Sequence, residues 1–281
     1  MPYIDCHAHV QFSAFKDDYK EVIERALKND IFIVNVGTQQ DTSRRAVETA
    51  HEFERGVYAT IGLHPIHTGK SYHDSQELGE GEAAIGFTSR GEELDYDYYK
   101  KLALDPKTVG IGECGLDYYH GASGEIEKDR QKDAFEKQIE LTKEVGKVLM
   151  VHSRDAFDDT LRILKSSGAH DGIAHSFVRT VEEAKELLDL GFYFTFAGNI
   201  TFKPRPDKPS ADEVIKYIPA DRLLSETDAP YLAPVPFRGK RNEPLYVIEV
   251  VKKLAELKGL TTEEMKNQIW QNARRVFKIN E

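Results

Sequence analysis

Short apolar runs alternate along the chain with longer segments in which apolar residues recur every three or four positions. Nearly continuous apolar runs occupy residues 31–36, 57–63 and 148–151, and such runs are typical of strands buried on both faces of a parallel sheet. Residues 19–28 have the other pattern, with apolar side chains on one helical face and charged side chains on the other. This alternation predicts a sheet whose strands are connected by amphipathic helices.

Eight strand–helix units can be identified in this way. The predicted strands begin with the segment that starts at Tyr3 and continue with residues 31–36, 57–63, 109–111, 148–151, 173–174, 192–196 and 223–224. Strands that alternate with helices form parallel sheets, and eight such units favour a closed (β/α)8 TIM barrel. We therefore predict an α/β fold in which residues 1–281 form a single barrel domain.

One connection is longer than the others. Residues 69–91, after the third predicted strand, are rich in Gly, Ser and Glu, and loops of more than roughly 12 to 15 residues are usually lids, binding loops or disordered inserts. We interpret this segment as an insertion. Because it follows His64 closely in the sequence, it is expected to influence which substrates reach that part of the barrel.

Composition limits the class of protein and its partners. The longest apolar runs are far shorter than the roughly 20 residues that a membrane span requires, so no membrane contact is expected. The chain has only two cysteines, Cys6 and Cys114, and no secretory signal is visible, which favours a cytoplasmic protein. The formal net charge of -10 argues against a broad basic surface for duplex DNA, so any nucleic-acid contact is expected to be local. No obligatory protein partner is evident.

The first candidate chemistry lies at the end of the opening strand. Side chains alternate along a strand, so Asp5, His7 and His9 share one face. Neutral imidazole is a good ligand for divalent transition metals, and a nearby acid such as Asp5 is a candidate to hold a ring nitrogen in the correct tautomer. A lone His-x-His is also compatible with incidental surface histidines.

Similar polar residues follow most of the other predicted strands, where TIM barrels carry their functional groups. These residues are His7, His9, His64, Glu113, His152, His175 and Asp228. Leaving His64 aside, four histidines and two carboxylates exceed the three protein ligands of a typical catalytic zinc site. We therefore predict a site for two divalent metal ions, with Glu113 bridging them. Imidazole and carboxylate suit several ions, so their identity stays open.

Two neighbouring cations can activate a water molecule and polarise a substrate oxygen. Asp228 is predicted to bind one cation and to orient or deprotonate that water. His64 has no necessary ligand role, so we assign it to a leaving or non-bridging oxygen of the substrate. The alternatives for His64 are a hydrogen-bond partner of a ligand or an ordinary residue of the barrel rim.

Several further residues are candidates for substrate binding. Lys203 and Arg205 follow the seventh predicted strand, and barrels often bind phosphate with the loops after strands seven and eight. Arg154 is a candidate phosphate ligand, with a buried ion pair as the alternative, and Tyr118 is a candidate to stack on a terminal base. A solvated basic loop is the alternative for Lys203 and Arg205, and local packing is the alternative for Tyr118.

Nearly the whole chain resembles the TatD family of metal-dependent deoxyribonucleases, within the amidohydrolase-like barrels. The resemblance rests on residues 5–9, 62–65, 112–118, 152–154, 175–177, 198–203, 226–232 and 241–244, and on Gln131, Phe135 and Gln138. It implies one metal at His7, His9, Glu113 and Asp228 and another at Glu113, His152 and His175.

The resemblance also implies a hydrolase that cleaves phosphodiester bonds in DNA, often from the 3′ end, with magnesium, manganese or zinc. DNA ends or short oligonucleotides are then the expected substrates. An ester or amide hydrolase, such as a D-aminoacyl-tRNA deacylase, stays an alternative because activated water attacks carbonyl carbon as well as phosphorus. Cys114 stands where the family commonly has an aliphatic residue, which changes only the packing beside Glu113.

Overall fold

The computed structural model describes residues 1–281 except residues 70–71, 74–86, 89–90, 121–123, 204–209 and 281. In these residues eight parallel strands form one sheet, in the order β1-β2-β3-β6-β7-β8-β9-β10. The strands are Tyr3–Ala8 (β1), Ile31–Val36 (β2), Val57–Ile61 (β3), Thr108–Asp117 (β6), Val148–Arg154 (β7), Ile173–Ala174 (β8), Tyr193–Phe196 (β9) and Leu223–Ser225 (β10).

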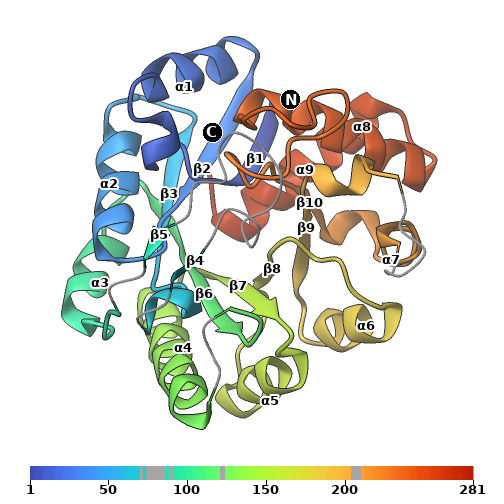
Figure 1. Ribbon diagram of the computed structural model, residues 1–281. Coiled ribbons are helices and arrows are strands. Elements are labelled where there is room, and N and C mark those ends of the chain that lie inside the picture. Colours follow the sequence, from blue (N-terminus) through green and yellow to red (C-terminus); the bar gives the residue numbers. More distant parts are fainter. Residues whose placement is uncertain (70–71, 74–86, 89–90, 121–123, 204–209, 281) are drawn as a thin grey trace.

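The first and last strands lie side by side and nearly close the sheet into a barrel (Figure 1). Ala8 and Ala229 form a parallel bridge, the His9 N–H donates to the Ala229 carbonyl over 2.8 Å, and the Asp228 N–H donates to the His7 carbonyl over 2.8 Å. The predicted (β/α)8 barrel is thereby confirmed.

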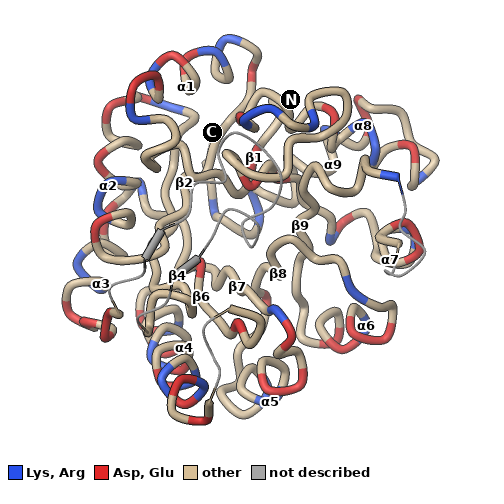
Figure 2. The backbone as a smooth tube through the Cα atoms, in the orientation of Figure 1, with Lys and Arg blue, Asp and Glu red and all other residues tan. Residues whose placement is uncertain are grey.

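Helices follow the strands and surround the barrel (Figure 1). They are Tyr19–Lys28 (α1), Gln40–His51 (α2), Tyr96–Ala103 (α3), Glu125–Val145 (α4), Phe157–Ser167 (α5), Val181–Asp189 (α6), Ala211–Tyr217 (α7), Val247–Lys258 (α8) and Thr262–Phe277 (α9). Figure 2 shows that acidic and basic residues are mixed over this outer ring. Among the described residues, no helix is both long and apolar enough to cross a membrane.

The apolar core lies between the strands and the inner faces of these helices. Val22, Ile23 and Ala26 of α1 are buried, as the helical pattern of residues 19–28 predicts. Removing apolar side chains from water contributes about 25 cal/mol per Å², and this burial holds the helices against the barrel. Cys6 and Cys114 are fully buried and form no disulfide.

Strand β6 is much longer than the predicted strand at residues 109–111, because it continues to Asp117. Its glycines interrupt the apolar pattern from which strands are recognised. Gly115 has a φ of +141°, and a Cβ there would lie 2.0 Å from the His152 carbonyl oxygen. Glycine thus lets β6 and β7 pair at Gly115 and His152, which brings Glu113 and His152 onto neighbouring strands.

The segment predicted as an insertion, residues 69–91, contains two short antiparallel strands, Tyr72–His73 (β4) and Phe87–Thr88 (β5). Most of its other residues lie outside those that the structure describes. The boundaries of the insertion, and its influence on substrates, therefore stay predictions.

Candidate metal centre

The imidazoles of β1 meet the carboxylate that follows β10. His7 Nε2 lies 3.1 Å from His9 Nε2, and Asp228 Oδ1 lies 3.8 Å from His7 Nε2 and 3.4 Å from His9 Nε2. These three ligand atoms lie within 4.8 Å of one another. Strand alternation therefore placed both histidines on one face, and closure of the barrel brings Asp228 to them.

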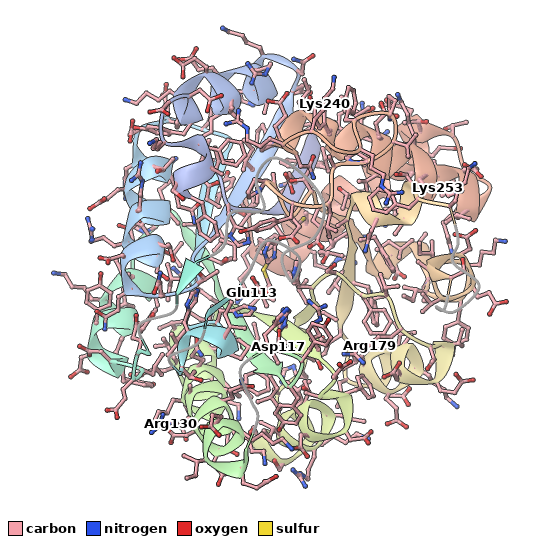
Figure 3. All side chains as sticks on the ribbon, in the orientation of Figure 1. Glu113, Asp117, Arg130, Arg179, Lys240 and Lys253 are labelled. Carbon is pink, nitrogen blue, oxygen red and sulfur yellow. The ribbon has the colours of Figure 1, made fainter. Side chains whose placement is uncertain are left out.

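Glu113 lies between this group and the other two imidazoles. Its Oε2 is 3.3 Å from His7 Nε2, whereas its Oε1 is 2.8 Å from His152 Nδ1 and 3.5 Å from His175 Nε2. Each carboxylate oxygen thus faces a different set of nitrogens. Figure 3 places Glu113 near the middle of the ring of strands. All six predicted ligands are brought together at one end of the barrel.

Hydrogen bonds outside the cluster orient two of the imidazoles. The Nδ1 of His9 lies 2.7 Å from the Val36 carbonyl oxygen, and the Nδ1 of His175 lies 2.9 Å from Glu226 Oε2. Both partners accept hydrogen bonds, so in the neutral form of each ring Nδ1 carries the proton and Nε2 directs its lone pair toward the cluster.

His152 is oriented in the same way through its other nitrogen. Its Nε2 lies 3.0 Å from Asp117 Oδ2, while Nδ1 faces Glu113. Asp117 is itself held by the backbone N–H groups of Tyr119 and His120, at 3.0 and 2.7 Å. Burial alone would raise the pKa of Asp117, but the hydrogen bonds from the rings of His120 and His152 lower it below its usual value.

The charges of the cluster suit a cation. Burial lowers the pKa of His152 and His175, but the adjacent carboxylates outweigh it and raise the pKa values to about 9 and about 10. Burial would likewise raise the pKa of Glu113, yet the surrounding imidazoles hold it well below its usual value. Protons on two imidazoles thus compensate the carboxylates in the metal-free protein. Divalent cations can supply the same compensation.

The donor set also fits divalent ions chemically. Imidazole nitrogen and carboxylate oxygen are good ligands for zinc and manganese. The buried Nδ1 of His7 has no hydrogen-bond partner among the described residues, and its Nε2 lies 3.1 Å from His9 Nε2 and 3.3 Å from Glu113 Oε2. The residues that are present could therefore hold a metal centre.

The role suggested for Asp5 is wrong. Its Oδ1 accepts hydrogen bonds from the backbone N–H groups of His7 and Thr227, at 3.2 and 2.9 Å, and its Oδ2 accepts one from the Thr227 hydroxyl. Asp5 thus joins β1 to the segment after β10. The acceptors that fix the imidazole tautomers are instead the Val36 carbonyl, Asp117 and Glu226, as described above.

His64 also lies against the cluster. Its Nε2 is 3.2 Å from Glu113 Oε1, and its Nδ1 accepts a hydrogen bond from the Ile66 N–H over 3.2 Å. The ligand atoms of His64, Glu113 and His152 form a third group within 4.8 Å of one another. Burial lowers the pKa of His64.

Two buried glutamines of α4 position the residues around the centre, and the sequence assigned them no role. Gln138 accepts a hydrogen bond from the Leu63 N–H over 2.8 Å and donates one to the Leu63 carbonyl over 3.1 Å. Gln131 does the same for Asp117, at 2.9 and 3.0 Å. One helix thereby fixes the backbone just before His64 and at Asp117.

Arg154 ends β7 and is exposed. Its guanidinium carbon lies 4.1 Å from the centre of the Tyr119 ring, and it forms no ion pair with a residue that the structure describes. The buried ion pair considered as its alternative is thus absent there. Tyr119 is 56% exposed. The sequence could not distinguish it from the adjacent Tyr118, because both residues are tyrosines.

The other predicted substrate contacts are Tyr118, Lys203 and Arg205. The Tyr118 hydroxyl donates to Asp159 over 2.6 Å, and Lys128 lies 4.9 Å from the centre of the Tyr118 ring. Lys203 is exposed just after the turn Gly198–Thr201. Arg205 lies outside the described residues. Substrate binding by these residues stays a prediction.

Comparisons with known proteins find relatives over almost the whole chain. The family model described as TatD related DNase matches residues 4–278. The chain is 43% identical over 279 residues to YabD from Bacillus subtilis, an uncharacterized metal-dependent hydrolase, with 98% of this chain and 99% of that protein covered. It is 33% identical over 283 residues to YcfH from Escherichia coli K12, another uncharacterized metal-dependent hydrolase, with 99% and 96% covered.

The structure is also similar to the crystal structure of YJJV, a TatD homologue from Escherichia coli K12. The TM-score is 0.81 and the sequence identity 25%, over 99% of this chain and 98% of that one. Sequence and fold agree over almost the full length of the chain. The chain therefore belongs to the TatD family of metal-dependent hydrolases.

Proposed function

We propose that this hydrolase cleaves phosphodiester bonds in DNA with two divalent cations, magnesium, manganese or zinc. The observation that carries the proposal is the position of Glu113, whose two oxygens face different sets of imidazoles. A carboxylate in this position suits a bridge between two cations, and paired cations are common in enzymes that cleave phosphodiester bonds. The description of the family as TatD related DNase supports the same substrate class.

The proposed ligands of one cation are His7, His9, Glu113 and Asp228, and those of the other are Glu113, His152 and His175. When bound, the cations supply electrostatic activation of water and of the phosphoryl group. Asp228 orients the water and accepts its proton. This role is supported by the exposure of its side chain, which is 17% against 6% for Glu113, because a base has to reach the water.

DNA ends, especially the 3′ ends of single strands, are the proposed substrates. Arg154, Lys203 and Arg205 are the proposed contacts to backbone phosphates, and Tyr118 is the proposed contact to a terminal base. A net charge of -10 favours such local contacts over an extended basic groove. Cytoplasmic location and the lack of an obligatory protein partner stay predictions.

End-labelled single-stranded DNA tests this function. After chelation, nucleotide release is expected to stop and to return when magnesium, manganese or zinc is added back. Glu113→Ala and Asp228→Asn are expected to abolish release, whereas Lys253→Ala, on the outer helix α8 (Figure 3), is expected to leave it unchanged. Cleavage by both site variants would contradict the proposal. Hydrolysis of D-aminoacyl-tRNA without cleavage of DNA would favour the alternative ester hydrolase.

A further inference from the structure

The ring of His64 is oriented differently from the rings of the proposed ligands. Its Nδ1 accepts a hydrogen bond from the Ile66 N–H over 3.2 Å, at the start of the turn Pro65–His67. A ring nitrogen that accepts a hydrogen bond carries no proton, so the one proton of the neutral ring is on Nε2. The resulting N–H group faces Glu113, whose Oε1 lies 3.2 Å from Nε2.

His9 and His175 have the reverse arrangement. In each, the outer Nδ1 faces an acceptor, the Val36 carbonyl at 2.7 Å or Glu226 at 2.9 Å. In the neutral rings, which are the forms that bind a metal ion, the protons therefore lie outside the cluster and the lone pairs face into it. Because a cation binds a lone pair and cannot bind an N–H group, the backbone donor at His64 distinguishes it from the ligands.

We propose that His64 is a neutral hydrogen-bond donor to an anionic oxygen of the substrate, and that it is a ligand of neither cation. The inference rests on the proposed function and specifies what the site recognises, namely a phosphoryl oxygen placed beside Glu113. His64 is only 6% exposed, and its ring centre lies 4.3 Å from that of His152. A donor in this position is shielded from water and adjacent to the second proposed cation.

Distance alone would also allow a cation between His64, Glu113 and His152, because their ligand atoms lie within 4.8 Å of one another. To bind it, His64 would have to move its proton to Nδ1. That proton would then face the N–H of Ile66, and two donors would meet across 3.2 Å. The hydrogen bond would be lost, and the Nδ1–H of the buried His64 ring would face another donor, which is costly.

Two substitutions separate a donor from a ligand. His64→Asn keeps an acceptor for the Ile66 N–H, since Asn is a strong N-cap residue, but it places no donor at the position of Nε2. His64→Gln carries an amide that extends farther and can replace that donor. Because His64→Asn retains the backbone hydrogen bond, it is expected to fold, and circular dichroism and the melting temperature check this.

The first measurement is calorimetric titration of the metal-free proteins with Mn²⁺. Both variants are expected to bind as many ions as the unmodified protein, because a donor is not a ligand. The second is the affinity of the manganese-loaded proteins for inorganic phosphate. Loss of a hydrogen bond to a charged group is expected to weaken phosphate binding at least about tenfold in His64→Asn, and His64→Gln is expected to recover part of the loss.

The tautomer can be observed directly in magnesium-loaded protein labelled with 15N-histidine. We expect an Nε2–H signal and an unprotonated Nδ1 that are both absent from His64→Asn. A protonated Nδ1, loss of an ion in His64→Asn, or unchanged phosphate binding would overturn the inference. If these results are as expected but DNA is not cleaved, DNA is not the substrate, and the role of His64 as a hydrogen-bond donor is retained. If DNA is cleaved but His64→Asn loses an ion, only the donor role of His64 is contradicted.

Discussion

Glu226 accepts a hydrogen bond from the Nδ1 of His175 over 2.9 Å, and its side chain is fully buried. The bond directs the Nε2 of His175 toward Glu113 and increases the basicity of the ring. Loss of such a carboxylate typically weakens metal binding 10–100-fold. Glu226→Gln is therefore expected to weaken Mn²⁺ binding by about one to two orders of magnitude, as measured by calorimetric titration.

The matched control is Glu182→Gln, which removes an exposed carboxylate from the first turn of α6. Its Mn²⁺ affinity is expected to equal that of the unmodified protein. Equal affinities in all three proteins would show that Glu226 does not tune the imidazole.

The metal-free protein is expected to become less stable as the pH rises. His152 and His175 have pKa values raised from 6.5 to about 9 and about 10 in the folded state. Their stabilising contribution is therefore complete below about pH 6.5 and is lost as the pH rises through 9 and 10. Each imidazole changes the free energy of unfolding by at most about 1.4 kcal/mol per pH unit.

Thermal unfolding followed by circular dichroism in EDTA measures this dependence. Between pH 7 and pH 9 the melting temperature is expected to fall. With Mn²⁺ present the fall is expected to be smaller, because metal binding favours unprotonated imidazoles. Identical pH profiles with and without the ion would contradict this assignment of charge.

Gln138→Leu is expected to destabilise the fold. The substitution leaves the N–H and the carbonyl of Leu63 without the hydrogen bonds that Gln138 provides. Each unsatisfied buried group costs about 1–3 kcal/mol, so a loss of about 2–6 kcal/mol is expected in urea denaturation. Glu136→Ala, at an exposed position of the same helix, is expected to change the stability by less than about 0.5 kcal/mol.

Arg154→Ala is expected to raise KM for single-stranded DNA with little change in kcat. If Arg154 contacts one phosphate, the slope of log KM against log salt concentration decreases by about 0.7. Arg154→Lys is expected to retain the slope, and Lys253→Ala, which disrupts an ion pair with Glu256 on the outer surface, is expected to change neither quantity. An unchanged slope in Arg154→Ala would remove Arg154 from the proposed DNA contacts.

The fold and the meeting of the proposed ligands could be predicted because both follow from local patterns. Apolar runs marked most strands, alternation placed His7 and His9 on one face, and the carboxyl ends of parallel strands meet at one end of a barrel. Strand β6 was underestimated because Gly112 and Gly115 lower the strand propensity of a segment that tertiary pairing with β7 nevertheless extends.

The partners that orient the imidazoles could not be predicted in the same way. Glu226 reaches His175 from another strand end, and Val36 contributes only a backbone carbonyl, which every residue has. Asp5 was chosen for its proximity in the sequence, but its carboxylate is used by the backbone of His7 and Thr227. Tautomers therefore depend on contacts that exist only in the folded barrel.

The contact between β1 and the segment that follows β10 has a consequence for biosynthesis. His7 and His9 emerge from the ribosome early, whereas Asp228 follows only after most of the chain has been translated. Chains grow at about 5–20 residues per second. The nascent polypeptide therefore contains His7 and His9 for on the order of ten seconds or more before Asp228 is added. An interrupted translation product that stops before Asp228 would lack one of the six proposed ligands and the bridge between Ala8 and Ala229 that closes the barrel.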